Sequence, residues 1–307
     1  MKQNNLKRTV RKSLNKYWDL YLLLIPVLAY FFIFKYLPMY GIQIAFRDYV
    51  PRKGFTGSNF VGLKHFTRFF SSYNCWTIIL NTIYLSFLNL LFNFPLPILL
   101  ALLLNEMRVK WAAKTLQMVT YAPHSLSTVV VCGMVVSFTS PSTGIVNAII
   151  KALGGQSIYF MAKNEWFRPL YIISDVWKNM GWNSIIFLSA LAAIDPALYE
   201  AASIDGASRF KQMLYVTLPS IVPTISIMLI LNAGKVMNVG FEKVFLLQTD
   251  LNLDVSEVIS TMVYRQGILN SKFSYASAID LFNSVVNLIL LVSVNSISKR
   301  VSEVGLW

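Results

Sequence analysis

Long apolar runs alternate with shorter polar segments along the 307-residue chain. A transmembrane helix needs ~20 predominantly apolar residues, and six runs approach or exceed this length. The second run is long enough to tilt or to project beyond the bilayer. The pattern predicts an all-α, polytopic membrane protein with six transmembrane helices. We expect these spans at approximately Leu20–Tyr36, Trp76–Leu104, Leu116–Thr139, Pro169–Ala193, Pro219–Val239 and Ala278–Ile297.

Composition and charge support this fold class. The chain is 55% hydrophobic and only 13% charged, whereas soluble domains carry about 25% charged residues. The net charge of +13 does not indicate nucleic-acid binding, because Lys and Arg are spread along the chain and no nucleic-acid motif is present. Basic residues precede the first run, at Lys2, Lys7, Arg8, Arg11, Lys12 and Lys16. The positive-inside rule places this N-terminus in the cytoplasm, and six crossings return the C-terminus to the same side.

This topology predicts four regions. They are a cytoplasmic basic tail at 1–17, the first transmembrane helix with an ordered external loop at 18–75, a transmembrane core at 76–300, and a cytoplasmic C-terminal tail at 301–307. The external segments 140–168 and 240–277 are polar enough to contact water. The first run is too long for a cleaved signal peptide and has no obvious small-residue cleavage site, so we expect a multi-pass plasma-membrane protein.

A polar stretch, YEAASIDGASRFKQMLYVTLP, separates the fourth and fifth runs. Just before it, Asp195 and Pro196 are typical of a helix start, because aspartate caps the free N–H groups and proline needs none in the first turn. We expect one short helix at Pro196–Ile204, a break at Gly206, and a second short helix at Ala207–Val216. Pro219 would then begin the fifth span, so the stretch is predicted to be a cytoplasmic helix–turn–helix.

Two interpretations of this helix–turn–helix remain open from the residues alone. Its small alanines and scattered apolar side chains suit insertion into a groove on another protein. The same pattern also suits an amphipathic loop that lies on the membrane surface.

Polar side chains inside the predicted spans are costly in lipid and therefore indicate function. Asp175, Lys178 and Asn179 share one helix face through their i, i+3 and i+4 spacing, and Trp182 extends that face. On the fifth span, Asn232 and Lys235 share a face. Hydrogen-bonding groups beside aromatic rings suit a saccharide, which offers both hydroxyls and apolar ring faces.

Each of these residues also has a purely structural interpretation. Asp175 and Lys178 can form an internal ion pair that only holds helices together. Lys235 lies near the outer end of its span and can extend to the interface, and His124 is expected to be a packing residue. If Lys178 and Lys235 both line the pathway, an acidic saccharide becomes the favoured substrate.

The polar stretch resembles a motif of a known family. Glu200-Ala201-Ala202, then Gly206, then Leu218-Pro219 resembles the EAA motif of ABC-importer permease subunits. The segments NTIYLSFLNLLFNFPLPILLALLLN and YAPHSLSTVVVCGMVVSFTSPSTGIVN also resemble this family. FKYLPMYGIQIAFRDY and the final GLW are similar to the complex-carbohydrate branch of the MalF/UgpA-type permeases, related to LplB and YteP. Maltose-type MalF has extra N-terminal spans and a large periplasmic insertion, which this chain lacks.

The resemblance implies a permease subunit that forms half of the pathway for ATP-driven uptake of oligosaccharides or polysaccharide fragments. Implied partners are a second permease in a heterodimer, two cytoplasmic ABC ATPases, an extracytoplasmic solute-binding protein, the saccharide and the bilayer. The implied ATPase-coupling residues are Glu200, Ala201, Ala202, Gly206, Leu218 and Pro219. The positions that fall where maltose-type permeases contact sugar are Tyr121, Ser125, Asp175, Lys178, Asn179 and Asn232, with different residue types at 178 and 179.

Two other functions compete with this one. A secondary carrier driven by an ion gradient would usually show inverted repeats, which the sequence lacks. An intramembrane enzyme would need a nucleophile and base inside the spans, and Ser125 and His124 lie on different helix faces. We expect no catalytic residue, metal site or cofactor, because the two histidines and two cysteines lack ligand spacing and no phosphate-binding loop is present.

Overall fold

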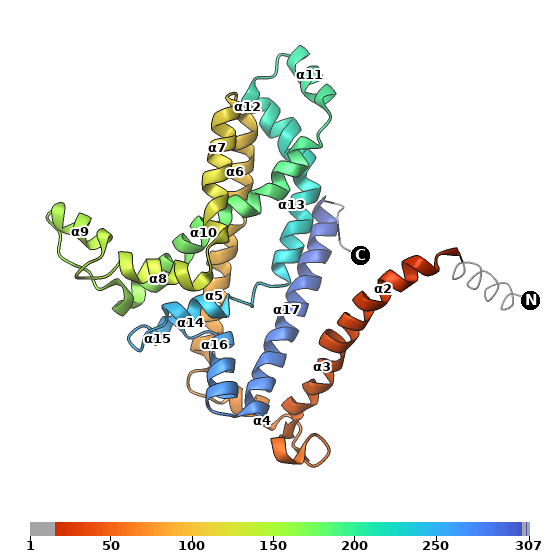
Figure 1. Cartoon of the computed structure of the whole chain (residues 1–307), viewed down its shortest axis with the longest axis vertical. Helices are drawn as coiled ribbons and strands as arrows, with labels where there is room; N and C mark the ends of the chain where they lie inside the picture. Colours follow the sequence, from red (N-terminus) through yellow and green to blue (C-terminus); the bar gives the residue numbers. More distant parts are fainter. Residues whose placement is uncertain (1–15, 303–304, 306–307) are drawn as a thin grey trace, which may run out of the picture.

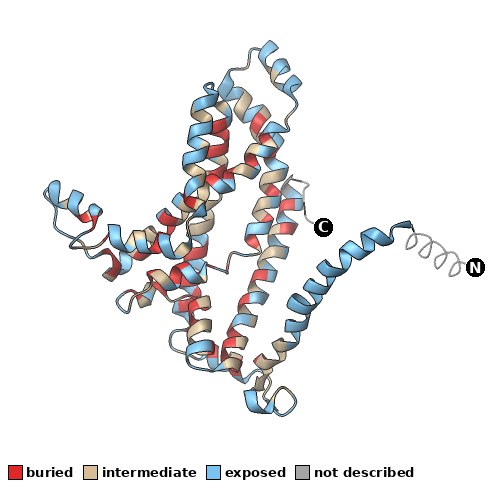
Figure 2. Cartoon of the chain, viewed as in Figure 1, coloured by how far each residue is buried: buried red, intermediate tan, exposed pale blue. Residues whose placement is uncertain are grey.

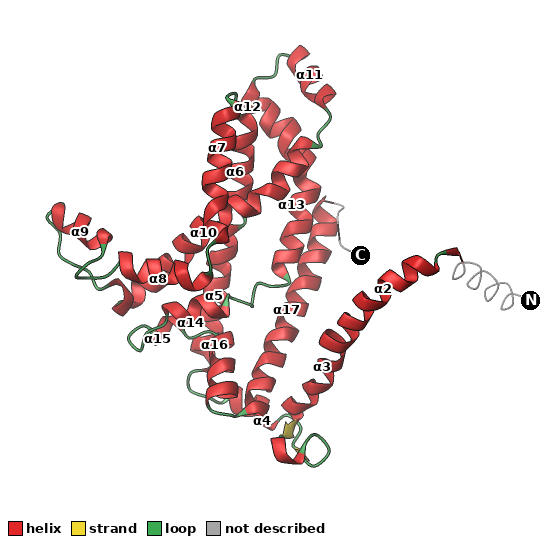
Figure 3. Cartoon of the chain, in the orientation of Figure 1, coloured by secondary structure: helices red, strands yellow, loops and turns green. Residues whose placement is uncertain are grey.

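The computed structural model describes residues 16–302 and residue 305, and it is almost wholly helical (Figures 1 and 3). Within this part, four helices are long and apolar enough to cross a membrane, or up to six if each of two bent helix pairs counts as one span. The all-α prediction is therefore confirmed. Most of the predicted basic tail and most of the C-terminal tail lie outside the described residues.

The first span stands apart from the other helices over its N-terminal part, whereas its last segment packs against the final helix of the chain. It comprises α2 (Trp18–Phe31), the π-helical η1 (Phe32–Tyr36), α3 (Leu37–Met39) and the 3₁₀-helical η2 (Tyr40–Phe46). Its most apolar 18-residue window has no buried residue, and Figure 2 shows α2 exposed on all sides. The predicted span is confirmed and runs on to Phe46.

An ordered loop follows at the far end of this span, as expected. Strand β1 (Arg47–Asp48) pairs antiparallel with β2 (Asn59–Phe60), with η3 (Pro51–Lys53) between them and α4 (Lys64–Phe70) after them. Asp48 accepts a 2.6 Å hydrogen bond from Lys64, which lowers the pKa of the Asp48 carboxyl. Tyr49 N–H donates to Ser274 Oγ at 2.9 Å, which joins the loop to the last helix.

The second span is confirmed as a 32-residue helical stretch, Cys75–Glu106. It consists of α5 (Cys75–Asn93) and α6 (Pro95–Glu106). The helix is interrupted at Phe94, because Pro95 has no N–H to continue the ladder.

The third predicted span, Leu116–Thr139, is a bent pair of helices and not one continuous helix. The chain forms α7 (Lys110–Tyr121) and η4 (Ala122–Ser125), then bends by 98° into α8 (Thr128–Phe138). Leu126 and Ser127 take extended backbone angles, and the Ser127 hydroxyl caps α8 by accepting from Val130 N–H. Pro123 within the preceding turn also prevents a continuous helix.

The fourth span is the long helix α10 (Asn164–Ala192), which begins five residues before the predicted Pro169. A small helix, α9 (Ile145–Ala152), and the short η5 (Phe160–Ala162) precede it. After α10 the chain bends by 69° into α11 (Pro196–Ile204). The short helix predicted at these residues is therefore present.

The second half of the predicted helix–turn–helix is wrong, because these residues belong to the fifth span. Instead of a separate helix at Ala207–Val216, the chain forms one helical stretch, Arg209–Ala233. It contains α12 (Arg209–Gln212), the π-helical η6 (Met213–Thr217) and α13 (Leu218–Ala233). The wider π-turn allows the helix to pass through Pro219, whose ring would clash with the carbonyl four residues earlier in an α-helix.

The segment 240–277, which was predicted to contact water, is largely part of the core. It forms α14 (Phe241–Leu247), α15 (Leu253–Ser256), α16 (Ile259–Tyr264) and the π-helical η7 (Arg265–Leu269). Val244, Leu247 and Val258 are buried together with residues of α5, α8 and α10. The sixth span, α17 (Phe273–Ser302), then confirms and extends the last predicted helix.

Candidate functional site

A polar cavity of about 270 Å³ lies within the helical bundle. Its walls come from α5, α6, α10, α13 and the chain that follows α13, which crosses the middle of the bundle in Figure 1. The walls carry several amide side chains that can donate and accept hydrogen bonds, at Asn89, Asn93, Asn183, Asn232 and Asn238. Among its described lining residues, only Asp175 and Lys235 are charged.

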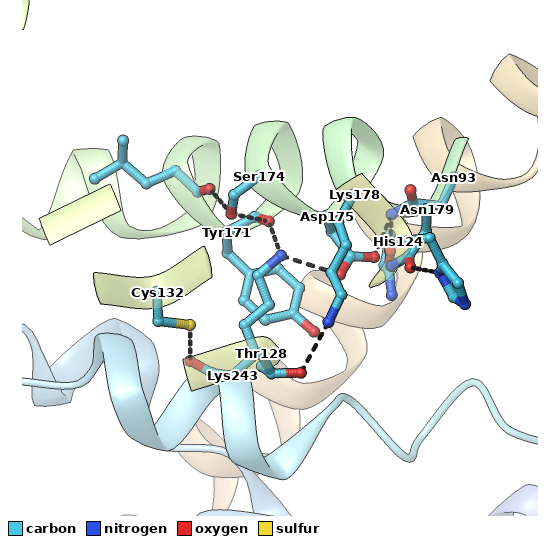
Figure 4. Close-up of polar contacts among 12 residues, drawn as sticks. Asn93, His124, Thr128, Cys132, Tyr171, Ser174, Asp175, Lys178, Asn179 and Lys243 are labelled. Carbon is cyan, nitrogen blue, oxygen red and sulfur yellow. Dashed lines mark hydrogen bonds and ion pairs between the residues drawn. The ribbon is translucent and has the colours of Figure 1, made fainter. Parts of the chain in front are cut away.

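Asp175 is tied to two other elements (Figure 4). Its Oδ1 accepts from Lys243 Nζ of α14 at 3.0 Å, and its Oδ2 accepts from Asn93 Nδ2 of α5 at 2.9 Å. The Lys243 ammonium also donates to the Tyr171 carbonyl at 2.8 Å and lies 4.6 Å from the centre of the Tyr171 ring. The proposed Asp175–Lys178 ion pair is therefore wrong, because Lys243 takes that place.

Lys178, Asn179 and Trp182 lie along the bend between α7 and α8 and not in the cavity wall. Lys178 Nζ donates to Thr128 Oγ1 at 3.1 Å. His124 Nδ1 lies 3.1 Å from Asn179 Oδ1, and its ring stacks on Trp182 with centroids 4.6 Å apart. His124 is thus a member of this polar cluster, although its side chain packs as expected.

The close approach of α7 and α10 explains why these side chains face the bend. A Cβ atom on Gly181 would lie only 2.1 Å from the Thr120 carbonyl oxygen. Only glycine permits this distance, and it brings the neighbouring face of α10 against the end of α7.

The remaining predicted pathway residues divide between the two places. Asn232 and Lys235 line the cavity, and Asn232 Nδ2 also donates to Met228 O at 2.8 Å. Tyr121 and Ser125 lie at the α7–α8 bend, where Ser125 Oγ donates to Ala122 O. The structure therefore brings Asp175, Asn232 and Lys235 into one cavity.

Four members of this site were not predicted from the sequence, namely Asn89, Asn93, Asn183 and Lys243. The three asparagines could have been found from the sequence, because amide side chains inside membrane spans are costly and therefore indicate a functional site. Lys243 carried no such signal, because it falls in a segment that was expected to be wet.

A second candidate site is the short helix α11, at one end of the molecule (Figure 1). None of its residues is buried, and Asp195 caps it by accepting from Ala197 N–H at 2.9 Å. Gly206 has φ +76°, the left-handed conformation expected for the break. Glu200 and Ala201 are exposed, as is Pro219, while Ala202 and Leu218 are half-buried.

Three side-chain hydrogen bonds join α11 and the turn after it to the fifth span. The Tyr199 hydroxyl lies 3.1 Å from Thr217 Oγ1 in the π-turn, where Thr217 is fully buried. Gln212 Nε2 donates to Ser203 Oγ at 3.0 Å and to Ala207 O at 3.1 Å. These hydrogen bonds therefore join α11 to the long helix that ends beside the cavity.

Residues 93–303 match the family described as binding-protein-dependent transport system inner membrane component. The chain belongs to this family. The permease is 43% identical to YteP of Bacillus subtilis (strain 168), a polygalacturonan/rhamnogalacturonan transport system permease protein, over 100% of the chain and 95% of YteP. It is 45% identical to protein LplB of the same organism, over 94% of the chain and 91% of LplB.

The fold matches that of a bacterial ABC transporter that imports the acidic polysaccharide alginate. A chain of that crystal structure aligns with a TM-score of 0.89 and 42% identity, covering 96% of the permease and 99% of the solved chain. A crystal structure of the same type of transporter with its alginate pentasaccharide-bound periplasmic protein gives the same values. These matches confirm the permease family indicated by the EAA-like motif and a multi-pass location in the plasma membrane.

Proposed function

We propose that the permease forms half of the translocation pathway of an ABC importer for oligosaccharides or polysaccharide fragments. The amide-lined cavity inside the bundle carries this proposal, because its donors and acceptors suit a ligand with many hydroxyl groups. The names of relatives give further support, since YteP is named for polygalacturonan and rhamnogalacturonan transport and the solved transporter imports alginate.

The exposed α11 is the proposed docking element for a cytoplasmic ATPase. In this proposal both chain termini also lie on the cytoplasmic side of the membrane. Glu200, Ala201 and Ala202 lie in this helix, which is narrow and exposed. When the ATPases close on ATP, α11 moves. Its contacts with Thr217 and Gln212 then carry the movement into the Arg209–Ala233 helix.

The complete importer in this proposal has four further components. They are a second, related permease, two ABC ATPases and an extracytoplasmic solute-binding protein. The permease itself supplies the pathway and performs no chemical step, whereas its ATPase partners hydrolyse ATP. A secondary carrier or an intramembrane enzyme would leave the exposed α11 without a purpose.

Gly206→Pro tests the docking element. Proline fixes φ near −65°, whereas Gly206 has φ +76°, so the turn after α11 must change. We expect ATP-dependent saccharide uptake by the assembled transporter to fall at least about tenfold, since strain at such positions is on the order of 1–3 kcal/mol. The ATPase should also separate from the permease during purification.

Gly154→Pro is the matched control. Gly154 also has positive φ, +84°, and donates its N–H to a residue three positions earlier, as Gly206 does, but it follows the small helix α9. The control should retain both uptake and the ATPase. Equal losses in the two variants would contradict a docking role for α11.

A further inference from the structure

We propose that Lys235 selects an anionic saccharide, of the uronate type, by binding its carboxylate in the cavity. We further propose that the Asp175–Lys243 pair makes this selection possible by cancelling the only negative charge in the described part of the cavity wall. This inference rests on the proposed function and names the class of substrate.

The negative charge of Asp175 is already balanced by a partner within the chain. Its two carboxylate oxygens each accept a hydrogen bond, one from the Lys243 ammonium at 3.0 Å and one from Asn93 at 2.9 Å. The side chains of Asp175 and Lys243 are 18% and 6% exposed. Since opposite charges at this distance and depth attract strongly, the carboxylate presents little net charge to a ligand.

Lys235 follows the end of α13 and has no such partner in the described part of the chain. Its side chain is exposed in the cavity wall and forms no ion pair with any described residue. An ammonium group has three donors and no acceptor, so its best ligand is an anionic oxygen. The described wall therefore carries one uncompensated positive charge.

Lys235 and Lys178 differ in whether they line the cavity. Both lysines were candidates for an acidic substrate, but Lys178 donates to Thr128 at the α7–α8 bend and does not line the cavity. Lys235 is therefore the lysine of the described cavity wall that is placed to meet a carboxylate.

The rest of the wall suits the sugar ring that carries this carboxylate. The side chains of Asn89, Asn183, Asn232 and Asn238 line the cavity and offer amide donors and acceptors. The hydroxyl groups of a saccharide can donate to and accept from these amides. Together these groups fit a polyhydroxylated anion better than a simple anion or a neutral sugar.

The test uses Lys235→Cys in the assembled transporter, reconstituted with its binding protein and ATPases. The introduced thiol is converted to a mixed disulfide that carries an aminoethyl, an ethyl or a sulfonatoethyl group. The same folded protein then presents a positive, neutral or negative group at position 235. ATP-dependent uptake of a tri-uronate is then measured. Lys178→Cys, treated identically, is the matched control, and the treated parent accounts for other cysteines.

We expect uptake in the order aminoethyl, ethyl, sulfonatoethyl at position 235. The step from positive to neutral should be about tenfold or more, because the hydrogen bond between the charged group and the carboxylate is lost. Position 178 should show no such order. Equal uptake with all three groups at position 235, or the same order at both positions, would overturn the inference.

A neutral trisaccharide distinguishes this inference from the proposed function. If the parent imports the neutral sugar but not the tri-uronate, the inference alone is overturned. If the parent imports neither with ATP, the proposed function fails as well.

Discussion

At the scale of single residues, Asp175 organises the polar interior. It joins α5 through Asn93 and α14 through Lys243, while it belongs to α10 itself. The cost of a charge in lipid correctly marked Asp175 as important from the sequence. Its partner was not predictable, because Lys243 lies 68 positions away in a segment whose polar residues suggested contact with water.

Asp175→Asn should destabilise the permease, because it leaves the buried Lys243 without a counter-charge. Loss of one partner of a buried pair costs about 3–5 kcal/mol, so the midpoint of thermal denaturation should fall. Asp250→Asn removes an exposed carboxylate that has no ion pair in the described chain, and it should leave the midpoint unchanged.

Replacing both charged partners refines this prediction. In Asp175→Asn/Lys243→Met the uncompensated ammonium is gone, so the midpoint should recover part of the loss. A double variant less stable than Asp175→Asn would mean that the two charges do not act as a pair.

Another residue-scale prediction concerns Gly181. A methyl group in Gly181→Ala would meet the Thr120 carbonyl at 2.1 Å, so α7 and α10 must separate. We expect the variant to lose about 1–3 kcal/mol of stability through overpacking. Gly133→Ala, in α8 with nothing within 4 Å, should be neutral or stabilising. Similar denaturation midpoints for the two variants would contradict the tight α7–α10 contact.

At the scale of elements, the differences between prediction and structure occur where helices bend or continue unexpectedly. Hydrophobic length predicted the straight spans well, as for α10 and α17. It did not predict the 98° bend between η4 and α8, because apolar length does not register Pro123, the residue that signals a break there. It also placed a helix start at Pro219, since the π-turn that accommodates this proline has no sequence signature that we used.

The contact between Tyr199 and Thr217 gives a prediction for coupling at this scale. Tyr199→Phe removes the hydroxyl that reaches the π-turn, while the ring remains. One neutral hydrogen bond is worth about 1 kcal/mol, so we expect the amount of saccharide transported per ATP hydrolysed to fall about fivefold. Total ATP hydrolysis should persist.

Tyr215→Phe is the control for this prediction. Tyr215 belongs to the same π-turn but is 76% exposed, and its hydroxyl makes no hydrogen bond within the described chain. Its ratio of transport to hydrolysis should match the parent. Identical ratios in all three proteins would show that the Tyr199 hydroxyl does not transmit movement.

At the scale of the whole molecule, one end carries the exposed α11, and the polar cavity lies within the bundle (Figure 1). The Arg209–Ala233 helix connects them, because it begins beside α11 and ends two residues before Lys235. In the proposed mechanism, a partner docked on α11 would alter the cavity through this helix without contacting it. The fold class and the family were accessible from apolar length and the EAA-like motif, whereas the cavity required the three-dimensional arrangement of the asparagines.

The central claim is that this chain is one half of an ATP-driven saccharide pathway. The most direct test is to purify the chain from its native cell in mild detergent, identify its partners by mass spectrometry, and measure saccharide uptake after reconstitution with the solute-binding protein. A second permease and an ABC ATPase should purify with it, and uptake should require ATP. A folded chain that purifies alone, or that transports without ATP, would contradict this claim.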